Sequence, residues 1–355
     1  MADVNSHLDN ITINISLDPA PQTSQGFDML LIVPLATNTL DGDRFRTYTG
    51  TADVAADLAA GYISAAVSTR LNVAFTQRPA PAQVLAGYAD LVGGETYATA
   101  IALIRAAGAS FYGVSILVRS DTEILAVALA MESDRGLFIL QSADADWLTT
   151  GLPGALTALA VYERTIIQYH DTDAEGQDIA IGANRLAYDP DVQSVPWDAP
   201  VNGVAALATA PNATQKGFLD ANNANHGLPY GGAAMFIDPG VNATGRPVYE
   251  IFTADWFEIR LEERVAAEKV AHSSRGQKLT IDAAGQAKIL SILEGLGAQG
   301  VAAEHFTEFS FEPVTITQAD KDAQRMRFTG VATFAVSARL FQFDLNFTRT
   351  AIADL

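Results

Sequence analysis

The most closely spaced chemically active side chains are carboxylates that alternate with other residues near the middle of the chain. They are Asp171, Asp173 and Glu175, followed after Gly176 by Asp178. Carboxylates at positions one, three and five with a glycine at position six are typical of the start of a calcium-binding loop. Position twelve is Gly182, where such a loop requires a bidentate glutamate. We therefore expect a solvated acidic turn without a metal ion.

A second acidic pair, Asp144 and Asp146, stands beside Trp147. Two carboxylates can act as acid and base only if burial or a neighbouring charge raises the pKa of one of them. The surrounding sequence shows no such environment, so we interpret the pair as part of a surface loop. No catalytic residue is predicted.

The histidines and the nucleotide-binding motifs give no further site. Five histidines show no HExxH or other close spacing, and we expect most of them at the surface or at helix ends: His7, His170, His226, His272 and His305. The sequence contains no GxxxxGK[ST] loop, GxGxxG turn or GxSxG elbow. We predict no cofactor and no enzymatic activity, and the alternative of another class is an α/β enzyme with an unrecognised active site.

The composition excludes several partners. The chain has 22 basic and 41 acidic residues, a formal net charge of -19, which repels phosphate backbones and anionic bilayers. We therefore expect no nucleic acid partner and no direct membrane insertion. With no cysteine there is neither a disulfide framework nor a thiolate metal site. The first residues lack the features of a signal peptide, so we expect folding in the cytosol.

The elements that must position any site begin with alternating apolar strands and helical stretches. Strands are predicted at Phe27–Leu35, Val84–Tyr88, Phe111–Val118, Leu137–Gln141 and Arg164–His170. Helices are predicted from Thr51 (one long alanine-rich helix), at Tyr97–Ala107, from Asp121 and near Leu152. This alternation indicates a mainly parallel sheet covered by helices. The proline-rich and glycine-rich stretch that follows, up to Arg246, permits no assignment of elements.

The last hundred residues predict two helices. Asp255 and Glu258 resemble a capping box, and apolar residues at i+4 spacing follow them. The charged face of this helix includes Arg260, Arg264 and Lys269, and it is either a surface that contacts a partner or an ordinary solvated helix face. A second helix is expected to start after Asp282 and to end at Gly297.

Strands dominate the rest of the C-terminal part. They are predicted at Glu308–Phe311, Val314–Thr317 and Arg327–Val336. Two further amphipathic strands lie at the ends of the chain, with apolar faces made of Ile11, Ile13, Ile15 and Leu17, and of Phe341, Phe343, Leu345 and Phe347. A proline-containing linker follows the first of them, so we favour its pairing outside its own domain. For the C-terminal strand, pairing within its own chain and pairing with another chain are both open.

Four segments resemble the sheath proteins of contractile bacteriophage tails. They are Ala74–Pro79, Phe218–Asn225, the Asp-Trp run Tyr249–Phe257 that leads into Ile259–Val265, and the Thr-x-Asp-x-x-Gly segment in Lys278–Gly285. The resemblance covers most of the chain in layout, and its motifs of moderate specificity lie between Phe218 and Gly300. The chain is shorter than many sheath proteins, which implies that large outer insertions are missing.

The resemblance implies a fold class of α/β plus α+β. An N-terminal arm and linker (1–26) would precede a mainly parallel, helix-covered α/β outer domain (27–250), and a C-terminal α+β assembly domain (251–355) would end in a second strand arm. In the family, such arms add strands to sheets of neighbouring subunits and link hexameric rings into a sleeve around a tail tube. The sleeve contracts and drives the tube through the target cell envelope without nucleotide.

The partners implied are copies of the chain itself, the tail tube protein, and the baseplate and tail terminator proteins. The implied location is the phage tail of a virion assembled in the host cytoplasm, and the charged helix face would lie near the tube. A sheath of a contractile injection system or of a bacteriocin would have the same sequence features. This alternative stays open.

Overall fold

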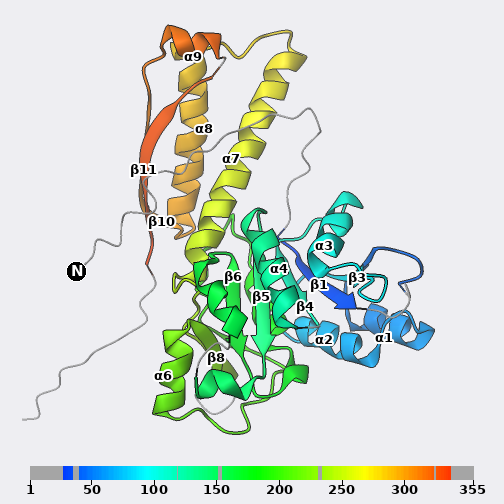
Figure 1. Cartoon of the computed structure of the whole chain (residues 1–355). Coiled ribbons are helices and arrows are strands. Elements are labelled where there is room, and N and C mark those ends of the chain that lie inside the picture. Colours follow the sequence, from blue (N-terminus) through cyan, green and yellow to red (C-terminus); the bar gives the residue numbers. More distant parts are fainter. Residues whose placement is uncertain are drawn as a thin grey trace, which may run out of the picture.

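The computed structural model describes residues 27–34, 40–117, 119–150, 154–230, 234–323 and 325–336. Its centre is a nine-stranded sheet with the order β2-β3-β1-β4-β5-β6-β8-β9-β7 (Figure 1). The strands are β1 (Met29–Pro34), β2 (Phe45–Tyr48), β3 (Val84–Ala89), β4 (Gly113–Ile116), β5 (Leu137–Ser142), β6 (Thr165–Tyr169), β7 (Ala199–Val201), β8 (Ala224–Tyr230) and β9 (Ala234–Asp238). The six strands β3, β1, β4, β5, β6 and β8 are parallel, which confirms a mainly parallel sheet.

Helices cover both faces of this sheet. One face packs against α1 (Thr51–Ala60), α2 (Ala65–Phe75) and α5 (Gln177–Leu186), and the other against α3 (Tyr97–Ala106), α4 (Asp121–Glu132), α6 (Ala213–Ala221) and the 3-10 helices η1 (Ala145–Leu148) and η2 (Gly154–Val161). Neighbouring strand residues point to opposite faces: Ile139 belongs to the first layer, and Phe138 and Leu140 belong to the second. The central strands are therefore buried on both sides, as in other parallel sheets.

The predicted alanine-rich helix is two helices, because α1 ends at Gly61. Gly61 has a φ of 76°, a left-handed conformation that glycine adopts without steric cost. The side chain of Ser64 then accepts a hydrogen bond from the Val67 N–H and starts α2. The edge strand β2, which pairs antiparallel with β3, has no counterpart among the predicted elements.

The stretch without assigned elements contains β7, α6, β8 and β9. Asn212 and Gln215 form a capping box at the start of α6. Strand β8 extends the parallel part of the sheet, whereas β9 and β7 are antiparallel additions at its edge. This region thus completes the sheet.

Two long helices, α7 (Val248–Ser274) and α8 (Ala283–Ala302), follow the sheet. The predicted capping box at Asp255 is wrong, because α7 already begins at Val248 and Asp255 is buried within it. Asp282 does cap α8, accepting a hydrogen bond from the Gly285 N–H at 2.9 Å. The predicted end of α8 at Gly297 is wrong, since the helix continues to Ala302.

The described chain ends with β10 (Phe306–Pro313), the short helix α9 (Gln318–Asp322) and β11 (Phe328–Phe334). The strand predicted at Val314–Thr317 is absent there, because Thr317 caps α9. Strands β10 and β11 form a separate antiparallel hairpin. In Figure 1, α8 lies between this hairpin and α7, and α9 stands at the end of the helices that is remote from the sheet.

Candidate functional site

The β10–β11 hairpin is held on α8 by apolar side chains from both strands. The strands pair from Phe306 opposite Phe334 to Pro313 opposite Phe328, with a register irregularity between Phe306 and Glu308. The side chains that pack against the main core are Phe306, Phe309, Phe311, Phe328, Ala332 and Phe334. Phe306 is buried and the other phenylalanines are half-buried. Full burial of a phenylalanine contributes on the order of 2 kcal/mol and partial burial less, and together these contacts anchor the hairpin to the helix.

Two glycines of α8 let the hairpin approach the helix closely. A methyl group at Gly297 would overlap the ring of Phe309, and one at Gly300 would overlap the ring of Phe306. Helix and strand therefore touch where a larger residue would push them apart. Gly297 fixes the position of the hairpin and does not end the helix.

The hairpin has two open edges within the described residues, because its sheet contains only β10 and β11. The Val314 N–H donates to the Arg327 carbonyl at 2.9 Å, and the Ala335 N–H donates to the His305 carbonyl at 3.1 Å. Odd-numbered residues of β11 thus turn their backbone groups towards β10, and even-numbered residues turn theirs outward. An open edge of this kind is a template for an additional strand.

A row of ion pairs along one face of α7 holds this helix to the sheet. Arg164, next to the start of β6, binds Asp255 with both terminal nitrogens, at 2.5 and 2.7 Å. Arg135, just before β5, binds Glu258 at 2.9 Å and Glu262 at 2.6 Å. Asp255 and Glu258, which the sequence suggested as a cap, are thus anchors three residues apart on one helix face.

A second junction joins the loop after α5 to α7 and α8. The carboxylate of Asp191 accepts hydrogen bonds from Trp256 Nε1 at 2.8 Å and Arg260 Nε at 2.9 Å. Burial favours its neutral form, but the bonds from Arg260 and Trp256 outweigh burial and lower the pKa of Asp191. Of the three candidate contact residues of α7, Arg260 is thus engaged internally, Arg264 contacts Gln299, and Lys269 is exposed.

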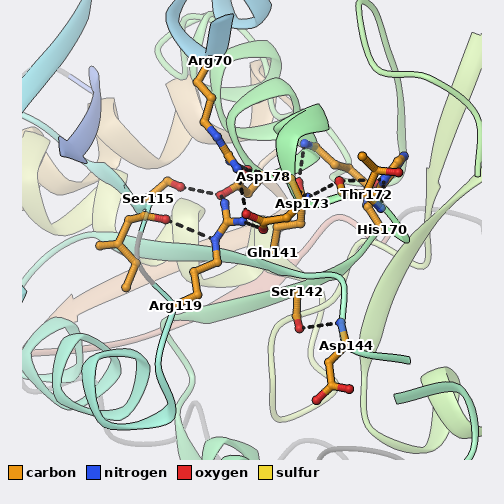
Figure 2. Close-up of polar contacts among 12 residues, drawn as sticks. Arg70, Ser115, Arg119, Gln141, Ser142, Asp144, His170, Thr172, Asp173 and Asp178 are labelled. Carbon is orange, nitrogen blue, oxygen red and sulfur yellow. Dashed lines mark hydrogen bonds and ion pairs between the residues drawn. The ribbon is translucent and has the colours of Figure 1, made fainter. Parts of the chain in front are cut away.

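The acidic run after β6 is not a uniformly solvated turn, because Asp178 is fully buried and its carboxylate faces Ser115, Arg119 and Arg70 (Figure 2). Arg119 contacts its carboxylate at 2.7 Å, Ser115 at 2.5 Å and Arg70 at 3.4 Å. Burial favours the neutral acid, but Arg119 and Arg70 outweigh it and lower the pKa of Asp178. Asp173 is exposed and still pairs with both arginines. The prediction of a solvated turn is therefore wrong for Asp178.

These ion pairs occupy the position where open α/β sheets commonly bind ligands. The order of the sheet reverses between β1 and β4, and the cluster lies at the carboxyl ends of the parallel strands, since Arg119 follows β4 and both aspartates follow β6. Its two arginines and two aspartates neutralise one another. The sequence signal that was missed is Arg70, a cation within the apolar helix α2 whose side chain is 5% exposed.

The pair Asp144 and Asp146 lies on the surface, as predicted. Asp144 caps η1 by accepting a hydrogen bond from the Asp146 N–H at 3.0 Å. Trp147 is buried beside Tyr169, with ring centroids 6.3 Å apart. The carboxylates are exposed and the indole belongs to the core.

The prediction that most histidines lie at the surface or at helix ends is wrong as to the surface for the four that the structure describes, although His272 does lie in the last turn of α7. His170, His226, His272 and His305 are all buried. His305 stacks on Trp256 with centroids 4.3 Å apart, and its Nε2 lies 2.7 Å from the Pro190 carbonyl. Among the described residues, no group of histidine, aspartate and glutamate side chains has the arrangement of a metal site. In the same part of the chain, no helix combines the length and the apolarity needed to span a membrane.

The predicted terminal strands lie outside the described residues. They comprise Ile11, Ile13, Ile15 and Leu17 at one end and Phe341, Phe343, Leu345 and Phe347 at the other. Their pairing therefore stays a prediction.

Comparison with known proteins finds similarity in the fold and no match to the sequence. No protein-family model matches the sequence, and no curated protein matches it either. Among solved structures, a chain from the contracted helical sheath of the anti-feeding prophage matches with a TM-score of 0.63 and 12% identity, covering 96% of this chain and 99% of the other. A chain from the contracted PVC sheath complex of an extracellular contractile injection system matches with a TM-score of 0.61 and 12% identity, and the coverage of the two chains is the same.

Two further structures match over similar lengths. A chain from the anti-feeding prophage baseplate gives a TM-score of 0.64 at 10% identity, with 96% and 99% coverage. A sheath tail protein from Listeria innocua gives 0.56 at 11% identity, with 87% of this chain and 96% of the other covered. From β1 through the α7–α8 pair to the β10–β11 hairpin, the chain has the fold of contractile tail sheath proteins.

Proposed function

We propose that the chain is a structural sheath subunit that polymerises as stacked hexameric rings around a tail tube. On contraction, the sleeve drives the tube through the envelope of a target cell. The observation that carries the proposal is the β10–β11 hairpin, anchored on α8 with two open edges, in a fold shared with sheath proteins.

Two open edges match two terminal strands. In the assembled sleeve, the strands Ile11–Leu17 and Phe341–Phe347 of neighbouring copies add to the hairpin, one at each edge. Their alternating apolar side chains continue the row of phenylalanines that faces α8. Backbone hydrogen bonds then hold the copies together while the linkers permit the subunits to shift.

The body of the subunit suits a mechanical role. Force between the sheet and the hairpin is transmitted by the ion pairs that join Arg164 and Arg135 to α7, and by the junction at Asp191. Contraction draws its energy from the difference between two packings of the same subunits, so it requires no nucleotide or other cofactor. The mutual ion pairs of Arg70, Arg119 and Asp178, at the usual ligand position of the sheet, support a structural role over an enzymatic one.

The proposed domains are the arm 1–26, the α/β outer domain 27–250 and the assembly domain 251–355. The proposed partners are further copies, the tube protein, and the baseplate and terminator proteins, with no nucleic acid and no membrane insertion. Tube contact is proposed for the charged face of α7, through Arg260, Arg264 and Lys269. The proposed location is a phage tail assembled in the host cytoplasm.

A sheath of a contractile injection system or bacteriocin is the second candidate. The observation that favours it is the similarity to a chain of the PVC sheath complex, which is described as part of an extracellular contractile injection system. Imaging of the particle that contains the chain separates the two, because a virion carries a genome-filled head and an injection system does not.

The test of strand addition is a deletion of residues 1–26. We expect the truncated protein to stay folded as monomers or rings and to form no tubes in electron micrographs. A matched pair refines the test: Ile13→Asp, on the apolar face of the predicted strand, should block tubes, whereas Asn14→Asp, on its polar face, should not. Tubes of normal length from the truncated protein would contradict the proposal.

A further inference from the structure

The exposed cations of the molecule are concentrated at one end. Of the lysines and arginines that the structure describes, eight are exposed, and seven of them lie in residues 268–288 and 314–327. These are Lys269, Arg275, Lys278, Lys288, Lys321, Arg325 and Arg327, and the eighth exposed cation is Arg78. We call the two segments the hairpin tip. They comprise the turn between α7 and α8 and the α9 segment, which adjoin at the end remote from the sheet (Figure 1).

The two segments of the tip are in contact, since Gln286 Nε2 donates to the Val314 carbonyl at 2.8 Å. Their acidic residues are largely used inside the tip. Asp282 caps α8, and Asp320, which is 2% exposed, binds Arg325 at 2.7 Å and Arg327 at 2.9 Å. The carboxylate of Asp320 thereby holds two guanidinium groups in place. The tip presents a preorganised cationic surface.

The charge of the tip differs in sign from that of the rest of the chain. The tip holds seven basic and four acidic residues, a formal charge of +3, whereas the other residues include 15 basic and 37 acidic ones. Within the described residues, Arg275, Lys278 and Lys321 form no salt bridge. Exposed charges without an internal partner are available to another surface.

The opposite end of the molecule is acidic. The loops after the parallel strands β3, β4, β5 and β6 (90–96, 117–123, 143–146 and 170–176) contain nine acidic residues and one arginine. Glu95 and Asp173 pair with arginines, and within the described residues the other seven acids form no salt bridge with a lysine or an arginine. We call these loops the carboxyl edge. Helix α7 is fastened at the amino ends of the same strands, through Arg135 and Arg164, and runs from there to the tip. The tip and the carboxyl edge thus lie at opposite ends of the subunit.

We propose that the hairpin tip of one copy docks on the carboxyl edge of a second copy, so that copies associate head to tail. This inference rests on the proposed assembly function and adds a charge-paired contact to the strand exchange. A second copy fits the tip because it carries the complementary charge at the complementary end. The net charge of -19 disfavours a nucleic acid or an anionic bilayer as the partner.

Charge reversal tests both surfaces in the full-length chain. One variant reverses the tip (Arg275→Glu, Lys278→Glu and Lys321→Glu), and the other reverses the edge (Asp121→Lys and Asp146→Lys). Asp121 and Asp146 are exposed. Sedimentation velocity at low salt measures self-association, and circular dichroism verifies the fold.

Each variant alone should associate at least about tenfold more weakly than the wild type, because tip and edge then carry like charges. Association of the wild type should weaken as salt shortens the screening length.

The decisive measurement is a mixture of the two variants. In the mixture, the reversed tip of one variant can bind the reversed edge of the other, and the native tip of the edge variant can bind the native edge of the tip variant. Both pairs carry opposite charges, so the mixture should recover the association of the wild type. The matched control is Arg78→Glu, which reverses the one exposed cation that the structure describes outside the tip and should leave association unchanged.

Unchanged association of the tip variant, or a mixture that recovers nothing, would overturn the proposal. It would also be overturned if the tip variant lost binding to DNA or anionic vesicles while its self-association stayed normal. Failure of the proposed function is a separate result: it is a wild-type protein that forms no tubes, whereas the tip is judged by self-association whether or not tubes form.

Discussion

Arg164 and Asp255 are 91 positions apart in the sequence and form a two-bonded ion pair, with nitrogen-to-oxygen distances of 2.5 and 2.7 Å. The hydroxyl of Tyr112 donates to the same carboxylate at 2.6 Å. The pair connects the amino end of a central strand to α7, the helix that packs against the hairpin-bearing helix α8. The Asp191 junction and the apolar packing of α7 in the main core are further contacts that hold this helix to the rest of the subunit.

Removing the cation from this pair should destabilise the fold. In Arg164→Met, the carboxylate of Asp255, 3% exposed, loses its charge partner, and the free energy of unfolding should fall by about 3 kcal/mol. Urea denaturation followed by circular dichroism measures the change. The double variant Arg164→Met with Asp255→Leu should regain part of the loss, because no buried charge is left unpaired. A double variant as unstable as the sum of both single variants would contradict this account.

The second ion-pair cluster supports an analogous prediction. Asp178→Asn leaves Arg70 and Arg119 without their buried anion and should lower the free energy of unfolding by about 3 kcal/mol. The matched control, Asp146→Asn, alters an exposed carboxylate and should change it by less than about 0.5 kcal/mol. Because the pKa of Asp178 is lowered in the fold, its contribution is present above about pH 4 and is lost as the pH falls further. The asparagine variant should therefore show a weaker loss of stability in acid.

The parallel sheet was predictable because its strands are buried on both faces and read as apolar runs. Ile139 and Phe138 both belong to the core, on opposite faces, so β5 is visible without knowledge of its partners. Helix α8 was equally predictable from the sequence, since Asp282 marks its start and the buried Ile289 marks its inner face. Local patterns of this kind carry the fold class.

The errors arose where a residue's role depends on a partner far away in the sequence. Asp255 resembles a cap until Arg164 is brought beside it, and Asp178 resembles a solvated acid until Arg70, 108 positions earlier, reaches it. Gly297 reads as a helix end, yet it is small because Phe309 crosses the helix there. The open edges of the hairpin were likewise invisible, because an unpaired strand looks the same in sequence as a paired one.

Stability should decline in mild acid because two buried histidines favour their neutral forms. Burial lowers the pKa of both His226 and His305 below the ordinary value of 6.5. Below about pH 6.5 the unfolded chain binds protons that the folded chain does not. The free energy of unfolding therefore decreases as the pH is lowered, by at most about 1.4 kcal/mol per pH unit for each histidine. Urea titrations between pH 7.5 and 5.5 measure the slope. In His305→Phe the slope should shrink, and an unchanged slope would exclude His305 as a cause.

A pair of glycines in α8 tests the contact between helix and hairpin. Gly297→Ala places a methyl group against the ring of Phe309 and should cost about 2 kcal/mol. Gly295→Ala has open space around the new methyl group and should stabilise the helix by about 0.5–1 kcal/mol. Thermal unfolding of both variants shows the difference. If the two substitutions had the same effect, the close approach would not hold in solution.

The open edge of β11 can be tested with a matched pair of prolines. Ala332 turns its backbone N–H outward, so Ala332→Pro removes a donor that has no strand partner in the described hairpin. Thr333 faces β10, so Thr333→Pro removes a bond of the hairpin itself and should lower the melting temperature more. If terminal strands of other copies add at this edge, Ala332→Pro should keep its fold and form few or no tubes in electron micrographs. A folded Ala332→Pro protein that forms tubes as readily as the wild type would show that the incoming strand does not use this edge of β11.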